Sequence, residues 1–236
     1  MEILPVATFH SPFTSKFGIP KQSGIVEQLE GTIVFTPEYR NADAIRGMEE
    51  FDYLWLIWGF SANRHAPRSL VVRPPRLGGN EKVGVFASRS PFRPNGMGLS
   101  SVRIARIEHD RLLGPVIHVL GADLMDGTPI YDIKPYVTYA DSHEGARSGF
   151  VDTHEWQRLQ VEMPREVEEK LSARMDPQQM EALRSVLAED PRPQYQKDAG
   201  KVYGMPYMQW DVHFRVDGGV LKVVDCEEKF KRRENI

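Results

Sequence analysis

The chain has 236 residues, a formal net charge of -3 at pH 7 and a single cysteine, Cys226. One cysteine excludes an intrachain disulfide and a metal centre built from cysteines alone, and it favours a reducing compartment. The first residues lack the basic and apolar regions of a signal peptide, and the longest apolar run, residues 53–60, is far shorter than the roughly 20 residues that span a bilayer. We therefore expect a cytoplasmic protein that does not bind a membrane.

Positive charge is concentrated in residues 64–103, which hold eight basic residues and one acidic residue. This segment has a formal charge of +7, so the rest of the chain carries -10. A basic stripe of this kind can neutralise several phosphates of a nucleic acid. A solvated basic face is the alternative, and composition alone does not decide between the two.

Residues 1–140 are predicted to form a β domain. Short apolar segments alternate there with Pro, Gly and Asn, and no long helix separates them, which favours a barrel or a sandwich over a doubly wound fold. One short helix is expected over residues 42–50. The expected strands cover residues 3–9, 31–35, 53–60, 83–87, 102–107, 116–120 and 131–137.

A smaller α+β domain is expected over residues 150–236, after a polar linker at 141–149. Val167, Leu171 and Met175 recur at helical spacing, and Asp176 with Pro177 marks the start of a second helix. Apolar residues alternate on both sides of the turn at 217–219, which predicts a C-terminal hairpin.

Several common enzyme motifs are absent. The sequence contains no P-loop, and the glycines at 96 and 98 follow a proline-rich loop instead of a strand, which argues against a Rossmann fold. The His-Glu pairs at 143–144 and 154–155 lack the second histidine of a zinc protease helix. We expect no metal site.

The loop at residues 17–24 is the first of three dense motifs. Glycine and proline can hold its backbone close to a ligand, and Gln22 offers both a donor and an acceptor. An ordinary connecting loop is the alternative.

The second motif, residues 73–98, places arginines beside prolines. Rigidly presented guanidinium groups suit bidentate contact with phosphate, and an exposed aromatic such as Phe92 can stack on a base. A structural loop stapled by proline is the competing interpretation.

The third motif, residues 121–136, joins a turn at 126–129 to a polar strand face. Asp132, Lys134 and Tyr136 alternate onto one face of that strand. On an otherwise apolar barrel such groups are costly unless they are paired or used in chemistry. The alternatives are a buried salt bridge and an active site.

Together these motifs resemble the TrmO family, also called YaeB or TsaA-like proteins, which are tRNA N6-threonylcarbamoyladenosine methyltransferases. The resemblance runs nearly end to end. It implies a methyltransferase built on a single-sheeted β-barrel, which uses S-adenosyl-L-methionine, modifies tRNA and forms a homodimer with the cofactor near the subunit interface. The matching segments are residues 17–24, 73–79, 88–95, 126–136 and 190–195.

The resemblance also implies a cofactor site. In this chain Ser61 stands where relatives often carry histidine, and Lys21 replaces a frequent arginine, so these two positions depart from the family pattern. The implied cofactor-binding residues are Pro20, Lys21, Gln22, Ser61, Ala62, Arg89, Leu99, Asp126, Gly127, Thr128 and Pro129.

For the chemistry we expect Asp132 or Tyr136 to act as general base, with Lys134 orienting the threonyl carboxylate of the substrate or assisting the phenol. Two alternatives stay open: a methyltransferase for a small molecule, and a non-catalytic RNA-binding module that has lost cofactor affinity. The expected tRNA contacts are Arg73, Arg76, Phe92, Arg93, Asn95, Arg192 and Lys201.

Overall fold

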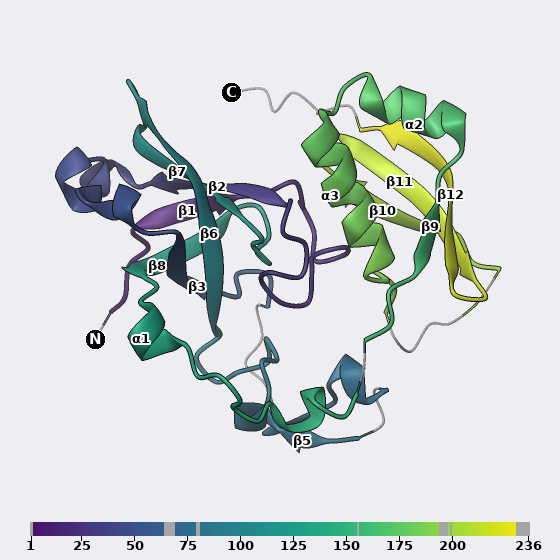
Figure 1. Cartoon of the computed structure of the whole chain (residues 1–236), viewed down its shortest axis with the longest axis horizontal. Coiled ribbons are helices and arrows are strands. Elements are labelled where there is room, and N and C mark those ends of the chain that lie inside the picture. The colour runs from purple at the N-terminus through teal and green to yellow at the C-terminus, as the bar shows by residue number, and fades with distance from the viewer. Residues whose placement is uncertain are drawn as a thin grey trace.

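Six antiparallel strands of the N-terminal part close into a barrel in the order β1-β2-β7-β6-β3-β8 (Figure 1). The computed structural model describes residues 2–63, 69–78, 81–154, 156–193, 198 and 200–229. The predicted mainly β fold with a single-sheeted barrel is confirmed. The barrel strands are β1 (Ala7–His10), β2 (Glu30–Phe35), β3 (Tyr53–Gly59), β6 (Met97–Asp110), β7 (Gly114–Leu120) and β8 (Thr128–Pro135).

The barrel closes around side chains that alternate along each strand. Ile33 of β2 and Leu54 and Leu56 of β3 are fully buried, while the residues between them are more exposed. Because successive side chains of a strand point to opposite faces, this period of two sends one set into the core and leaves the other set outside. The outer set of β3, which includes Trp55 and Ile57, is therefore free to form a binding surface.

Three local predictions for the barrel part were wrong. The first strand begins at Ala7 instead of residue 3. Residues 83–87 form no barrel strand: β5 (Val83–Gly84) pairs only with β4 (Val71–Val72), and a 3-10 turn, η5 (Val85–Ala87), follows. The expected helix at 42–50 is split into two 3-10 turns, η2 (Ala42–Ile45) and η3 (Met48–Glu50), because Gly47 between them has a φ of 84°. Further short turns are η1 (Pro37–Tyr39), η4 (Pro75–Leu77), η6 (Gly149–Val151) and the one-turn helix α1 (Thr138–Asp141).

The C-terminal part is a four-stranded sheet in the order β10-β11-β12-β9, packed with two helices (Figure 1). The predicted hairpin is β11 with β12, and both predicted helices are present. Asp176 and Gln179 form a capping box at the start of the second helix, which explains why the chain turns there. The elements are β9 (Gln160–Glu162), α2 (Arg165–Ser172), α3 (Pro177–Ala188), β10 (Tyr203–Tyr207), β11 (Trp210–Asp217) and β12 (Val220–Glu228).

The segment between β1 and β2 joins the two hydrophobic cores. Phe13, Val26 and Leu29 are buried in the C-terminal core, although they belong to the N-terminal half of the sequence. The ring of Phe13 meets that of Tyr207 edge to face at 5.5 Å between centroids. Phe17 and Ile19 also pack against this core, so the C-terminal core helps to hold the loop at 17–24. The division into domains at 1–140 and 150–236 stays our proposal.

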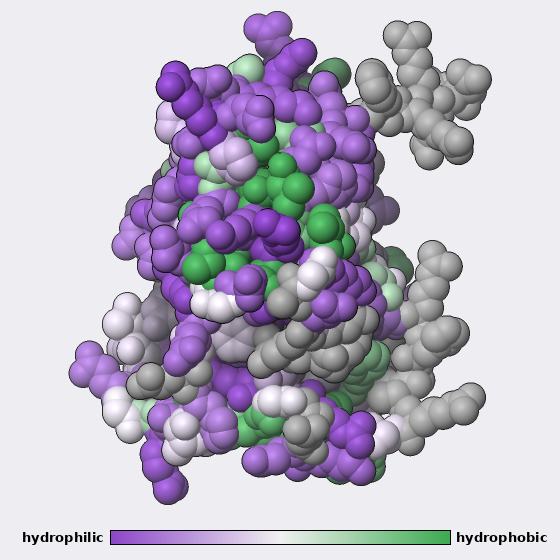
Figure 2. All heavy atoms as spheres, turned by 90° about the vertical axis from the view of Figure 1, so that its right-hand side faces the viewer, coloured by the Kyte–Doolittle hydropathy of each residue, from purple (hydrophilic) through white to green (hydrophobic). Residues whose placement is uncertain are grey.

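The face of the molecule on the C-terminal side is polar. Figure 2 shows a largely hydrophilic face on the C-terminal side, with hydrophobic side chains gathered in limited groups. Within the part of the chain that the structure describes, no helix combines the length and the apolar character needed to cross a bilayer.

Candidate active site

A cavity of about 640 Å³ lies on the outer face of the barrel. Its walls come from the loop at 17–24, the end of β3 with the residues after it, the loop before β6, and the segment between β7 and β8. Trp55, Ile57 and Leu99 supply outward-facing side chains of β3 and β6. All three sequence motifs therefore contribute to one site.

Basic side chains outnumber acidic ones on the described wall of the cavity. Four basic side chains and one acidic side chain occur among the described lining residues. The aromatic and apolar part of the wall is larger, as in most small-molecule sites. The charged residues are Lys16, Lys21, Arg89, Arg93 and Asp123, and the apolar ones are Ile19, Pro20, Trp55, Ile57, Trp58, Phe60, Ala62, Pro91, Met97, Leu99 and Met125.

Gly98 makes room for the aromatic floor of the cavity. It is the cross-strand partner of Trp58, and a Cβ at position 98 would lie 2.3 Å from the Trp58 ring. The indole Nε1 of Trp58 donates a hydrogen bond to Ser100 Oγ at 3.0 Å. Phe60 meets the same indole edge to face at 4.4 Å. A glycine at position 98 is thus needed to seat Trp58.

Asp123 ends the hydrogen-bonded chain that starts at Trp58. Ser100 Oγ donates to Asp123 Oδ1 at 2.6 Å. Burial raises the pKa of the Asp123 carboxyl, while the Ser100 hydroxyl and the nearby charge of Arg89 act in the opposite direction. Asp123 belongs to the motif at residues 121–136 but was assigned no role there, because local spacing does not reveal that its carboxylate meets Ser100. Its place soon after the apolar strand 116–120 was the available clue.

Lys21 connects the cavity to the C-terminal part. Its Nζ lies 3.3 Å from the centroid of the Trp156 ring, a cation–π contact. Desolvation lowers the pKa of Lys21 to about 8, and the acidic groups of Asp190 and Glu189 oppose this shift. The neighbouring Gln22 accepts a hydrogen bond from Arg89 at 2.8 Å.

Most of the residues implied as cofactor ligands lie on this cavity. Eight of them line it: Pro20, Lys21, Gln22, Ser61, Ala62, Arg89, Leu99 and Thr128. Asp126, Gly127 and Pro129 are not among the described lining residues. The Asp126 carboxylate instead accepts from the backbone N–H of Ser11 at 3.2 Å and lies 3.1 Å from Nδ1 of His10. The turn at 126–129 contributes to the wall through Thr128.

The structure does not bury the polar face predicted for β8. Asp132 and Lys134 form an ion pair at 3.2 Å with side chains 50% and 63% exposed. They lie opposite Ile57 and Trp55 on the outer face of the barrel, and the register shifts at Ile57/Trp58. The alternative of a buried salt bridge is therefore wrong, because the pair is half-exposed.

Tyr136 lies beside the cavity without lining it. Its ring packs 5.9 Å from that of Trp55 and 6.1 Å from that of Tyr53. None of Asp132, Lys134 and Tyr136 occurs among the described residues of the cavity wall, although Trp55 does. The three side chains border the site that we expected them to form.

The predicted tRNA contacts fall into two groups. Arg73, Phe92 and Asn95 are exposed, and the Phe92 side chain is 54% accessible. Arg76 and Arg93 take part in the fold: Arg76 Nε donates to the carbonyl of His154 at 2.7 Å, and Arg93 donates to two loop carbonyls.

The two C-terminal candidates are also engaged. Arg192 forms a paired contact with Asp190 at 2.8 and 2.9 Å, and both side chains are almost buried. Lys201 lies 5.1 Å above the Tyr203 ring. The structure therefore does not present Arg192 as an accessible positive charge. Several residues of the basic and family-like segments lie outside the described residues: Arg64, Arg68, Gly79, Gln194 and Tyr195.

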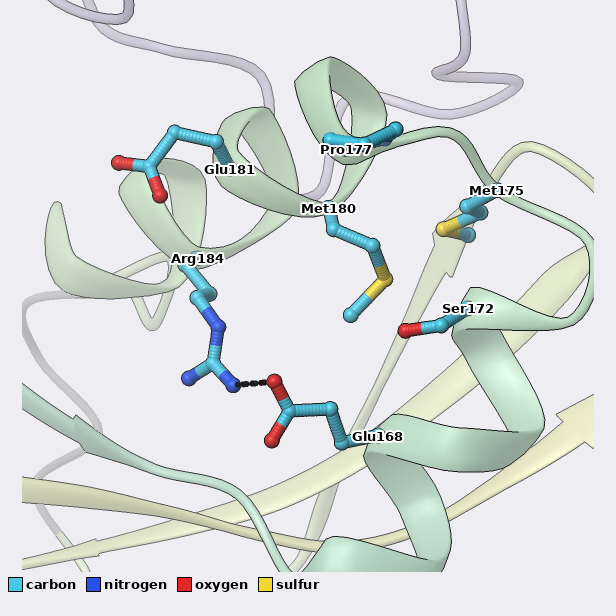
Figure 3. Close-up of a pocket in the computed structure, with 7 residues that line it drawn as sticks. All are labelled: Glu168, Ser172, Met175, Pro177, Met180, Glu181 and Arg184. Atoms are coloured by element: carbon cyan, nitrogen blue, oxygen red, sulfur yellow. Dashed lines mark ion pairs between the residues drawn. The ribbon is translucent and has the colours of Figure 1, made fainter.

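A second hollow, of about 360 Å³, lies between α2 and α3 (Figure 3). Arg184 of α3 and Glu168 of α2 form an ion pair across it at 2.7 Å. The rest of the hollow is lined by Ser172, Met175, Pro177, Met180 and Glu181. No residue of the three sequence motifs lines this hollow, so it is a poor candidate for the chemistry.

A group of potential metal ligands lies on the C-terminal sheet. Donor atoms of His213, Asp225 and Glu227 come within 4.8 Å of one another. This group is distant in sequence from the motifs and does not line the cavity. The absence of a metal cofactor stays a prediction.

Comparison with known proteins finds similar chains that match both parts of this one. Residues 8–142 match the tRNA-methyltransferase O N-terminal domain, and residues 156–229 match the TrmO C-terminal domain. A tRNA (adenine(37)-N6)-methyltransferase of Escherichia coli is 37% identical over 95% of this chain and 97% of its own length. A putative S-adenosylmethionine-dependent methyltransferase of Pseudomonas aeruginosa is 38% identical over 90% and 91% of the two chains. The crystal structure of TrmO from Pseudomonas aeruginosa superposes with a TM-score of 0.77 at 32% identity, covering 96% of this chain and 98% of that one.

Proposed function

We propose, from the premise that this chain belongs to the tRNA-methyltransferase O family, that it methylates N6 of threonylcarbamoyladenosine next to the anticodon of tRNA. Membership of this family makes the chain an S-adenosylmethionine-dependent tRNA methyltransferase, and the Escherichia coli relative that matches almost its full length is named for N6 of adenine 37. The threonylcarbamoyl group is the finer part of the proposal. The single observation that supports it best is the cavity, whose charged lining is mostly basic.

The cavity has the chemistry that S-adenosylmethionine requires. Trp55, Trp58 and Phe60 offer apolar surface for an adenine ring, while Lys21 and Arg89 can receive the carboxylate of the donor's amino acid part. A volume of about 640 Å³ falls within the range of small-molecule sites. The donor supplies an electrophilic methyl group, and the protein has to orient both reactants and exclude water.

A threonylcarbamoyl substrate carries a second carboxylate. More positive charge lines the cavity than the donor's carboxylate alone would need, since Lys16, Lys21, Arg89 and Arg93 all contribute. We therefore assign one part of this positive charge to the threonyl carboxylate. An unmodified adenosine lacks that carboxylate and should bind more weakly.

The exposed residues of the arginine-proline motif are suited to the RNA backbone. Arg73 can contact a phosphate, and Phe92 can stack on a base of the anticodon loop. Asn95 is exposed three residues after Phe92 and can hydrogen-bond to a phosphate or a base. These contacts position the tRNA, while the cavity selects the modified adenosine.

Exposed apolar side chains beside the cavity favour a homodimer. Leu99 is 57% and Phe86 is 75% exposed, both near the basic loop. A second copy would cover such surface, which a monomeric protein rarely leaves open. We propose a cytoplasmic homodimer whose interface adjoins the cavity, and light scattering at low micromolar concentration tests its mass.

The test is mass spectrometry of nucleosides from tRNA incubated with protein and S-adenosylmethionine. Two tRNA samples are compared, one with threonylcarbamoyladenosine and one transcribed without it. We expect one added methyl group on the modified nucleoside only. Methylation of the unmodified tRNA would remove the threonylcarbamoyl part of the proposal.

The same experiment separates the two rival functions. Methylation of neither tRNA, together with calorimetric binding of the donor, would favour a small-molecule substrate. Failure to bind the donor would favour a non-catalytic RNA-binding module. In that case Ser61 and Lys21 would be the first residues to replace with the histidine and arginine that relatives often carry.

A further inference from the structure

We infer that the carboxylate of Asp123 accepts the proton that leaves N6 of the substrate adenosine during methyl transfer. This inference rests on the proposed function and names a residue for one of its steps. It also moves the role of general base from the β8 residues Asp132 and Tyr136 to a residue on the cavity wall.

Few of the described side chains on the cavity wall can accept a proton. No histidine and no tyrosine line it in the described part of the chain, and Asp123 is the one carboxylate there. The other ionisable side chains on the wall, Lys16, Lys21, Arg89 and Arg93, are donors when charged. Among the described residues of the wall, Lys21 is the rival base, because its lowered pKa of about 8 leaves a fraction of it neutral at pH 7.

The position of Asp123 is fixed before any substrate arrives. Its Oδ1 accepts from Ser100 Oγ at 2.6 Å, and that hydroxyl accepts in turn from the indole of Trp58 at 3.0 Å. Ser100 is 1% exposed, so the row of hydrogen bonds from Trp58 to Asp123 is anchored within the barrel. Because a carboxylate has about four lone-pair sites, the bond from Ser100 leaves capacity for a further donor.

The surroundings of Asp123 act on the pKa of its carboxyl in two directions. Burial raises the pKa of its carboxyl, which makes the ionised form a stronger proton acceptor than an exposed aspartate. The Ser100 hydroxyl, backbone N–H groups and the charge of Arg89 favour the ionised form. The net shift is upward, so the carboxylate of Asp123 is more basic than that of an exposed aspartate.

The step balances as a displacement. The bond between N6 and the methyl carbon forms as the carbon–sulfur bond breaks, and the electron pair of that bond stays on sulfur. N6 lies between a purine ring and a carbonyl, so its lone pair is delocalised and its proton is easier to remove than that of a simple amine. Transfer of this proton to Asp123 leaves a neutral N-methyl product and a neutral carboxylic acid, which then loses the proton to water.

The first test replaces Asp123 with Asn, which keeps the size and removes the base. We expect the single-turnover rate of methyl transfer to fall at least about 100-fold, the usual lower range for a lost general base. Calorimetry should give a dissociation constant for S-adenosylhomocysteine within about threefold of the wild type. Asp43→Asn is the matched control, because Asp43 is an exposed aspartate of the barrel part that lies outside the cavity.

The outcomes separate the inference from the proposed function. A D123N rate equal to that of the wild type would overturn the inference and leave the proposed function intact. A loss of affinity for S-adenosylhomocysteine as large as the loss of rate would make Asp123 a binding group, which also overturns it. An inactive wild-type protein would instead contradict the proposed function.

A second variant, Ser100→Ala, tests the inference even if D123N does not fold. It removes a hydrogen bond that lowers the pKa of Asp123, so that pKa should rise. The acidic limb of the pH profile of the single-turnover rate should move to higher pH, and the rate should recover at alkaline pH. A uniform loss of rate at all pH values, or an acidic limb that does not move, would contradict the role of Asp123.

Discussion

Asp123 and Asp132 lie nine positions apart in the same motif, and the fold treats them in opposite ways. Asp123 faces the cavity and is held by Ser100, while Asp132 lies half-exposed on the outer face in an ion pair with Lys134. Burial raises the pKa of the first carboxyl, and the hydrogen bond from Ser100 opposes this rise. The type of a charged residue therefore tells less about its chemistry than whether its side chain lies on the cavity wall.

The largest expected effect concerns the almost buried ion pair between Arg192 and Asp190. Arg192→Ala leaves the Asp190 carboxylate almost buried without its paired guanidinium, so we expect a loss of about 3 kcal/mol in unfolding free energy. Urea denaturation measures it. Arg165→Ala, which breaks a highly exposed ion pair, should cost less than about 0.5 kcal/mol. Wild-type stability of the Arg192 variant, together with weakened tRNA binding, would restore Arg192 as a phosphate contact.

The next effect concerns the floor of the cavity. Gly98→Ala places a Cβ 2.3 Å from the Trp58 ring, so the indole has to shift and its bond to Ser100 is lost. We expect about 1–3 kcal/mol of destabilisation from overpacking and at least a tenfold weaker binding of S-adenosylhomocysteine by calorimetry. Gly84→Ala is the control, since a Cβ there meets no atom within 4 Å. Equal affinities of the two variants would show that the floor does not form the donor site.

Lys21 provides a smaller, pH-dependent effect. With a pKa of about 8, its ammonium is charged below that pH and is lost as the pH rises through it. If Lys21 holds the donor's carboxylate, the dissociation constant should rise severalfold between pH 7 and 9. Lys21→Arg should remove most of this rise because arginine keeps its charge. An identical pH dependence in both proteins would place the titrating group elsewhere.

The smallest effect is expected on the outer face. Asp132→Asn breaks an exposed ion pair beside Trp55, so we expect KM for tRNA to rise less than about threefold, with little change in the single-turnover rate. Steady-state and single-turnover assays check this together. A large fall in the single-turnover rate would favour Asp132 over Asp123 as the base.

Much of the fold could be predicted from residue patterns. The short apolar segments at 31–35 and 53–60 mark barrel strands, and Asp176 with Pro177 marks the start of a helix. The split of residues 42–50 depends on the conformation of Gly47, which no periodicity reveals. The family resemblance pointed to eight residues of the cavity wall.

The rest of the site depends on contacts that are remote in sequence. Asp123 meets Ser100 only because β7 and β6 are neighbours in the barrel, and Lys21 meets Trp156 only because the loop between β1 and β2 reaches the C-terminal part. The register shift at Ile57/Trp58 kept Asp132 on the outer face. Such contacts follow from closure of the barrel and not from local spacing.

The most direct measurement of the central claim is ultraviolet cross-linking of methyl-labelled S-adenosylmethionine to the protein, followed by peptide mapping. The account predicts label on peptides that hold cavity residues such as Trp55, Trp58 or Met97, and less label when S-adenosylhomocysteine competes. Label confined to the peptides of the hollow between α2 and α3 would contradict it.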